Sequence, residues 1–142
     1  MLSISLAETG ERVLLVDADL RNPSIHRLLK LENRCGLSDC LVGAANFRDV
    51  VQVMEKLPAL HVITAGGKTP NPVVLLDSSF ADSLLEQFSG GYDRVIFDVP
   101  PALQMADALI LAGKVHATIL VFQSGRTHQD IARKLIERIS LA

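Results

Sequence analysis

The sequence predicts an α/β domain built around a parallel sheet, and three observations lead to this fold class. First, four short apolar blocks recur along the chain and are continuous rather than alternating, as in strands buried on both faces. Second, segments with helical spacing of apolar residues lie between these blocks. Third, strand and helix patterns alternate throughout, which favours parallel strands joined by right-handed crossovers. The predicted strands are Arg12–Asp17, Leu60–Ala65, Arg94–Val99 and Ala117–Phe122.

Helices are predicted in order around these strands. Residues 1–9 read as the end of a helix, which Gly10 closes in the usual position. The last helix is expected to begin at Thr127, because Thr127 and Asp130 have the spacing of a capping box. Apolar residues at helical spacing predict four further helices, over Ser24–Leu31, Ser38–Val42, Asn46–Lys56 and Pro72–Phe88. The last helix is expected to bury three residues: Ile131, Leu135 and Ile139.

Composition excludes several classes of protein. The 142 residues are 49% hydrophobic with a net charge of −2, so the chain is not disordered. No apolar run approaches the roughly 18 residues of a membrane span, and residues 1–6 lack the features of a signal peptide. Cys35 and Cys40 cannot form a disulfide framework, and with no companion His they are a poor metal signature. We therefore expect a soluble intracellular protein.

Aspartates follow two of the predicted strands. Asp17 ends the first strand with Asp19 two residues later, and Asp98 ends the strand before Pro100-Pro101. The carboxyl ends of parallel strands share one edge of a sheet, where ligands bind. Carboxylates that converge there suit Mg²⁺, which is usually shared between carboxylate and phosphate oxygens. The alternative is that each aspartate caps the turn or helix that follows it.

One apparent phosphate-binding motif is incomplete. Gly66-Gly67-Lys68-Thr69 contains the GK[ST] tripeptide, but the full motif needs a glycine five positions before Gly67, where Val62 stands. The following Pro70-Asn71-Pro72 also disfavours a helix that starts at the tripeptide. We therefore do not interpret this segment as a Walker loop.

Several strings of this sequence resemble the bacterial tyrosine kinases of capsule and exopolysaccharide export. They are ETGERVLLVDADLRNPSIH, GLSDCLVG, LHVITAGGKTPNPVVLL, YDRVIFDVPPAL, DALILA and ILVFQSGRT, in the family's order over nearly the whole chain. VDADLR followed by NP and the D-x-P-P strand are specific in combination, and P-N-P-x-x-L-L separates this family from its relatives. The resemblance implies a doubly wound P-loop NTPase fold that transfers the γ-phosphoryl group of ATP to protein tyrosines.

The resemblance also implies a role for each aspartate. Asp17 and Asp19 match the modified second Walker motif, whose carboxylates act with Mg²⁺ and the incoming tyrosine hydroxyl. Asp98 matches the Walker B aspartate, which holds Mg²⁺ directly or through water. The expected cofactors are therefore ATP and Mg²⁺, with all three aspartates catalytic and with Asp17 and Asp98 as metal ligands. Phosphoryl transfer depends on such positioning and charge neutralisation more than on covalent help.

Further residues are candidates for nucleotide contact. Arg21 follows the aspartate pair and is expected to pair either with it or with phosphate. The residues after the last predicted strand reach the same sheet edge, where relatives of this fold place the nucleotide base. They are Gln123, Ser124, Gly125 and Arg126. Asp107 is interpreted as a cap or a salt link, not as a catalytic group.

The sequence also departs from the family pattern. The family's Walker A loop should lie just before the helix that ends at Gly10, and a tyrosine-rich tail should follow the last helix. Residues 1–142 contain neither, and the single tyrosine, Tyr92, is interpreted as a packed aromatic. We therefore expect residues 1–142 to form a single partial, N-terminally truncated P-loop kinase domain. Alone, this polypeptide is expected neither to bind ATP tightly nor to phosphorylate itself.

The resemblance implies partners and a location as well. These are a membrane-bound chain-length regulator as activator, homo-oligomers, and a cytoplasmic site at the inner face of the membrane. A nucleic-acid partner is not expected, because the net charge is −2 and the basic residues of the last helix are balanced by acidic ones. Two alternatives stay open: a partition or septum-site P-loop ATPase, and a non-catalytic remnant that acts only by partner binding.

Overall fold

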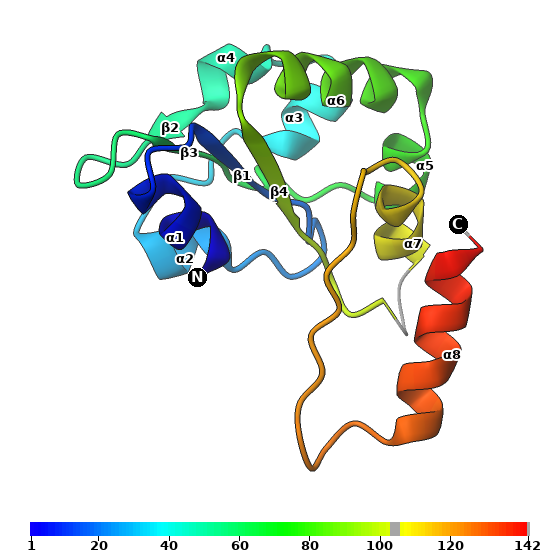
Figure 1. The fold of residues 1–142 in the computed structure, drawn as a ribbon. Coiled ribbons are helices and arrows are strands. Elements are labelled where there is room, and N and C mark those ends of the chain that lie inside the picture. The colour runs from blue at the N-terminus through cyan, green and yellow to red at the C-terminus, as the bar shows by residue number, and fades with distance from the viewer. Residues whose placement is uncertain (103–105, 142) are drawn as a thin grey trace.

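The structure is a computed structural model that describes residues 1–102 and 106–141; Leu103 of the YDRVIFDVPPAL string and Ala142 lie outside this range. A four-stranded sheet in the order β2-β3-β1-β4 forms its centre (Figure 1). β1 pairs in parallel with both β3 and β4, whereas β2 is antiparallel to β3. The α/β class with a mainly parallel sheet is therefore confirmed. The strands are β1 (Val13–Asp17), β2 (Gln52–Val53), β3 (Leu60–Ile63) and β4 (Arg94–Asp98).

Helices cover both faces of this sheet (Figure 1). Gly10, at φ +92°, follows the end of α1 as predicted. None of the described helices is long and apolar enough to cross a membrane. The helices are α1 (Leu2–Glu8), α2 (Ile25–Leu29), α3 (Leu37–Leu41), α4 (Phe47–Val50), α5 (Pro72–Leu76), α6 (Ser79–Gly91), α7 (Ala106–Ala112) and α8 (Gln129–Ser140).

β1 is buried at all five of its positions, as its continuous apolar sequence predicts. Successive side chains of a strand point to opposite faces of the sheet. Leu14 and Val16 accordingly pack into a cluster that contains Phe88 of α6. Val13 and Leu15 pack into a second cluster, which includes Ala7 of α1 and Ile25 of α2. The strand that ends at Asp17 is thus held between two hydrophobic layers.

The helix predicted over Asn46–Lys56 is wrong beyond its first turn. α4 ends at Val50, Val51 takes extended angles (φ −66°, ψ 129°), and β2 follows. The side chain of Gln52 accepts a hydrogen bond from the Glu32 backbone N–H (3.1 Å) and donates one to the Glu32 carbonyl (2.8 Å). β-Branched residues favour extended backbone. Pairing with β3 makes this segment a strand rather than a helix. The helical spacing of its apolar residues carries no information about that pairing.

The helix predicted over Pro72–Phe88 is divided into α5 and α6. Ser78 stands between them and caps α6, because its Oγ accepts a hydrogen bond from the Ala81 N–H (3.1 Å). The same hydroxyl donates to the Leu75 carbonyl at the end of α5 (2.7 Å). One serine therefore satisfies backbone groups at both helix ends, which makes an interruption favourable within a continuous apolar pattern.

The strand predicted over Ala117–Phe122 is also wrong. These residues are irregular, and Val121 is 89% exposed. A strand needs a neighbour for its backbone hydrogen bonds, and in the described sheet β4 is an edge strand that this segment does not pair with. Figure 1 shows the segment between α7 and α8 running away from the sheet.

The last helix differs from its prediction in two respects. α8 begins at Gln129 rather than Thr127, and no side-chain capping hydrogen bond is present at its first turn. Leu135 is buried as predicted, whereas Ile131 is 37% exposed and Ile139 is half-buried. A helix that packs through a narrow stripe buries fewer positions than its periodicity suggests.

Candidate functional site

Asp17 and Asp98 lie side by side where β1 and β4 end. They are register partners in the parallel ladder, and the Ala18 N–H donates to the Asp98 carbonyl (2.8 Å). Neighbouring strands are about 4.8 Å apart. The two carboxylates therefore stand at one sheet edge, as the sequence predicted from the strand ends.

Asp17 is fully buried and only half satisfied. Its Oδ2 accepts hydrogen bonds from the backbone N–H groups of Ser24 (3.1 Å) and Ile25 (3.0 Å) at the start of α2. Its Oδ1 is buried with no hydrogen-bond partner among the described residues. Burial raises the pKa of this carboxyl, and the two backbone donors oppose part of that effect. Asp17 thus holds the start of α2 with one oxygen, while the other accepts no described hydrogen bond.

Asp19 shapes the loop after β1. Its Oδ1 accepts hydrogen bonds from the backbone N–H groups of Arg21 (3.2 Å) and Asn22 (2.9 Å), which forms a tight turn. The alternative expectation, that these aspartates cap the turn or helix that follows, is therefore confirmed for Asp19 Oδ1. Asp19 remains half-buried beside the other two carboxylates.

Asp98 experiences the charge of its neighbours. Burial raises the pKa of its carboxyl, and the negative charges of Asp17 and Asp19 raise it further. Like charges held this close favour a proton or a cation between them. Among the described residues, no group of three or more His, Cys, Asp or Glu side chains could hold a metal ion by itself. A divalent cation at this edge would therefore need ligands from phosphate or water as well, which is how Mg²⁺ is usually held.

In the described structure the side chain of Arg21 pairs with neither Asp17 nor Asp19, one of the two partners expected for it. Its Nε donates to Oδ2 of Asp107 (2.8 Å) and its Nη2 donates to Oδ1 (3.4 Å). Asp107 lies in the first turn of α7, and its side chain is only 2% exposed. The salt link expected for Asp107 is confirmed. Its partner Arg21 lies 86 residues away in the sequence, and no local pattern connects positions so far apart.

The four residues predicted to contact adenine lie in an exposed turn before α8. The Gln123 carbonyl accepts from the backbone N–H groups of Arg126 (3.1 Å) and Thr127 (3.0 Å), and Gly125 takes φ +75°. They were expected at the sheet edge because a strand was predicted before them. Since that strand does not form, the structure does not bring Gln123, Ser124, Gly125 or Arg126 to this edge, and their contact with a nucleotide stays a prediction.

The GK[ST] segment does not form a phosphate-binding loop. Gly66 is buried at φ +81°, and it exchanges hydrogen bonds with the side chain of Asn33 (2.9 and 3.1 Å). Lys68 is exposed, and the next helix starts at Pro72 rather than at the tripeptide. The sequence-based rejection of a Walker loop here is confirmed.

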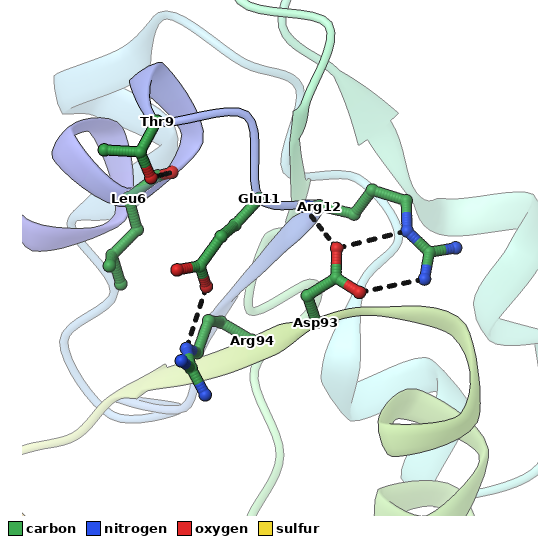
Figure 2. Close-up of polar contacts among 6 residues, drawn as sticks. All are labelled: Leu6, Thr9, Glu11, Arg12, Asp93 and Arg94. Atoms are coloured by element: carbon green, nitrogen blue, oxygen red, sulfur yellow. Dashed lines mark hydrogen bonds and ion pairs between the residues drawn. The ribbon is translucent and has the colours of Figure 1, made fainter.

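The opposite end of β1 and β4 carries ion pairs of a different kind (Figure 2). Arg12 contacts Asp93 through its backbone N–H (2.8 Å), Nε (3.3 Å) and Nη2 (3.0 Å). Arg94 pairs with Glu11 (2.8 Å). Tyr92, also at this end, is a packed aromatic as predicted: it is half-buried, and its hydroxyl lies 2.9 Å from His61 Nδ1.

Comparison with known proteins gives consistent results. The model of a family described as AAA domain matches residues 1–140. The tyrosine-protein kinase YwqD of Bacillus subtilis (strain 168) is 39% identical over 139 residues, which are 98% of this chain and 58% of the relative. The kinase domain of the Escherichia coli tyrosine kinase ETK is 34% identical with a TM-score of 0.94, over 99% of this chain and 55% of that one. The chain thus spans little more than half the length of these two relatives.

Two further solved structures allow a comparison of this chain with a kinase domain and with a septum-site protein. The VpsO kinase domain is 32% identical with a TM-score of 0.92, over 99% of this chain and 68% of that one. The septum site-determining protein MinD of Pyrococcus horikoshii, complexed with Mg-ADP, is 25% identical with a TM-score of 0.62, over 77% of this chain and 44% of that one. MinD is therefore a more distant relative, and the chain belongs to the AAA-domain family that includes the bacterial tyrosine kinases.

Proposed function

We propose that this chain provides the aspartate-bearing part of an ATP-dependent protein-tyrosine kinase that acts in capsule or exopolysaccharide synthesis. The observation that carries the proposal is the pairing of Asp17 with Asp98, in which a buried carboxylate oxygen of Asp17 has no hydrogen-bond partner among the described residues. The kinase names of the relatives agree with it. The more distant MinD makes a septum-site ATPase the weaker candidate.

The three aspartates fit the requirements of phosphoryl transfer. Asp17 Oδ1 and the carboxylate of Asp98 would hold Mg²⁺, which supplies charge neutralisation at the phosphates when bound. Backbone donors from Ser24 and Ile25 hold the Asp17 carboxylate in one orientation, in which Oδ1 meets no described hydrogen-bond donor. Asp19, next to this pair, would accept the proton of the incoming tyrosine hydroxyl.

The proposal assigns the phosphate-binding loop to a segment outside residues 1–142. The G-x-x-x-x-G-K-[ST] motif does not occur in this sequence, and the curated relatives are longer than the part that matches. Residues 1–142 would then be one part of a P-loop kinase domain. The resemblance to the kinases of capsule and exopolysaccharide export supports three further parts of the proposal. A membrane-bound chain-length regulator is the proposed activator, the intact protein is proposed to form homo-oligomers, and its proposed location is the cytoplasmic face of the membrane.

The test uses the product of the complete reading frame that encodes this chain. With Mg·ATP, the wild type is expected to become phosphorylated on tyrosine, detected with a phosphotyrosine antibody and by mass spectrometry. Asp98→Asn should lower the rate at least 100-fold, because Mg²⁺ would lose a carboxylate ligand and with it its hold at the phosphates. Asp93→Asn, at the other end of the same strand, is the matched control and should remain active. A wild type without ATP-dependent phosphotyrosine would support the non-catalytic alternative and overturn the proposal.

A further inference from the structure

The bidentate ion pair of Arg21 with Asp107 is the strongest polar contact near the aspartates that the proposed chemistry does not use. The Asp107 carboxylate is 2% exposed, and both of its oxygens accept from the guanidinium, at 2.8 and 3.4 Å. A buried carboxylate is costly unless it is paired in this way. Arg21 is therefore held in place by a group that has no other charged partner among the described residues.

The backbone of Arg21 extends this contact to the candidate site. Its N–H donates to Asp19 Oδ1 (3.2 Å), and the next residue, Asn22, donates to the same oxygen (2.9 Å). The turn around the Asp19 carboxylate thus contains the residue whose side chain is paired with Asp107. Buried Asp107 contacts the side chain of Arg21, and the backbone of Arg21 contacts Asp19, so the three residues form a continuous series of contacts.

The same pair connects the segments that follow the two aspartate-bearing strands. Arg21 lies in the loop after β1, whereas Asp107 lies in α7, the first helix after β4. Asp17 and Asp98 mark the ends of those strands. The Arg21–Asp107 pair therefore joins these two segments beyond the point where the β1–β4 ladder ends.

We propose that Arg21 and Asp107 are positioning residues that hold the Asp19 turn against α7 and so set the geometry of the carboxylates for phosphoryl transfer. This inference rests on the proposed kinase function. It assigns Arg21 to Asp107 rather than to phosphate, because Nε and one terminal nitrogen of the guanidinium are already engaged with a buried carboxylate. Misplacement of a reacting group by about 1 Å can cost about 100-fold in rate, so such a pair matters without touching substrate.

Arg21→Lys is the informative substitution. Lysine keeps the positive charge beside Asp107 but cannot make the two-pronged contact, whereas Arg21→Ala would leave a buried carboxylate unpaired and is expected to impair folding. Arg12→Lys is the matched control, because Arg12 makes a similar contact with Asp93 at the other end of the same two strands (Figure 2). Arg12 contacts none of the three site aspartates in the described structure.

The kinetic measurement uses the product of the complete reading frame. We expect Arg21→Lys to lower kcat about 10- to 100-fold and to change KM for ATP less than about twofold, while Arg12→Lys stays within about twofold of the wild type. A raised KM with unchanged kcat would assign Arg21 to the nucleotide and overturn the inference. An unchanged kcat and KM would overturn it as well.

A second measurement needs neither nucleotide nor metal. Amide hydrogen exchange of Asn22, whose N–H donates to Asp19, is followed by NMR in the 142-residue chain. We expect Arg21→Lys to reduce the protection of this amide about tenfold and Arg12→Lys to leave it unchanged. Unchanged protection in Arg21→Lys would overturn the inference. If the wild type proves inactive as a kinase, the proposed function fails, and this measurement alone decides the role of the pair.

Discussion

Asp17 and Asp98 are partners in the β1–β4 register, and both carboxyls have a pKa raised above its ordinary value. Two such groups at one sheet edge lower the stability of the ligand-free fold, because no described basic side chain forms an ion pair with either carboxylate. Unpaired buried charges at functional sites commonly lower the stability of a fold in this way. The effect of these carboxyls on stability can be measured by unfolding, which does not require kinase activity.

The first prediction is that Asp98→Asn stabilises the ligand-free chain at pH 7. Because the pKa of folded Asp98 is raised above 3.8, ionisation disfavours the folded state, in full above the raised pKa and not at all below 3.8. The gain of the variant, about 0.5–2 kcal/mol, should therefore be present at neutral pH and disappear as the pH falls towards 3.8. Urea unfolding at several pH values measures it, and a destabilised variant at pH 7 would contradict the charge argument.

The second prediction concerns Asp93 at the other end of β4. The hydrogen bonds and positive charge of Arg12 lower the pKa of this carboxyl (Figure 2). Its contribution to stability is then present above the ordinary value of 3.8 and is lost as the pH falls through the lowered pKa. Asp93→Asn should lower Tm at pH 7 and match the wild type in strong acid.

Salt provides the control for that ion pair. The side chains of Arg12 and Asp93 are 65% and 46% exposed, so the pair is screened and its contribution is small. The Tm difference between wild type and Asp93→Asn should decrease in about 1 M NaCl. A difference that persists unchanged would point to packing rather than charge.

The third prediction is that Gly66→Ala destabilises the chain strongly. Gly66 has φ +81°, and an added Cβ would lie 2.4 Å from Asp39 Oδ2 and 2.7 Å from the Gly36 nitrogen. Backbone strain and this clash together should cost about 2–4 kcal/mol, measured by urea unfolding. Gly67→Ala is the matched control, because a Cβ there meets nothing within 4 Å. Equal stability of the two variants would contradict the described geometry of this turn.

The fourth prediction tests the boundary between α5 and α6. Ser78→Ala removes the cap that accepts from the Ala81 N–H, which should cost about 1 kcal/mol. Ser83→Ala serves as control, since Ser83 lies inside α6, is exposed, and its hydroxyl donates to the Ser79 carbonyl one turn earlier. Thermal unfolding of both variants compares them. If α5 and α6 were one continuous helix, Ser78→Ala would be neutral or stabilising.

Local patterns were sufficient where a residue's environment depends on its own segment. The continuous apolar sequence of β1, with hydrophobic layers on both faces, predicted its burial correctly. Gly10 after α1 followed from the requirement for a left-handed residue at a helix end. The aspartates at the ends of β1 and β4 could be placed at one edge because parallel strands share their carboxyl ends.

Patterns failed where a contact distant in sequence decides the conformation. The segment over Asn46–Lys56 has helical periodicity, yet pairing of Gln52 and Val53 with β3 makes it extended. Ala117–Phe122 has the composition of a strand, yet composition cannot supply a hydrogen-bonded neighbour. With that strand absent, the adenine contacts predicted for residues 123–126 have no support in the structure.

The sequence by itself determined the α/β class, the two aspartate-bearing strand ends and the resemblance to tyrosine kinases, because these depend on short-range pattern and on motif spacing. Only the tertiary structure decided which oxygen of Asp17 stays free and which partner Arg21 takes. Both depend on side chains that approach from other elements, at α2 and α7. The physical reason is that burial and pairing of charge are properties of the packed chain, and the spacing of residues along it does not record them.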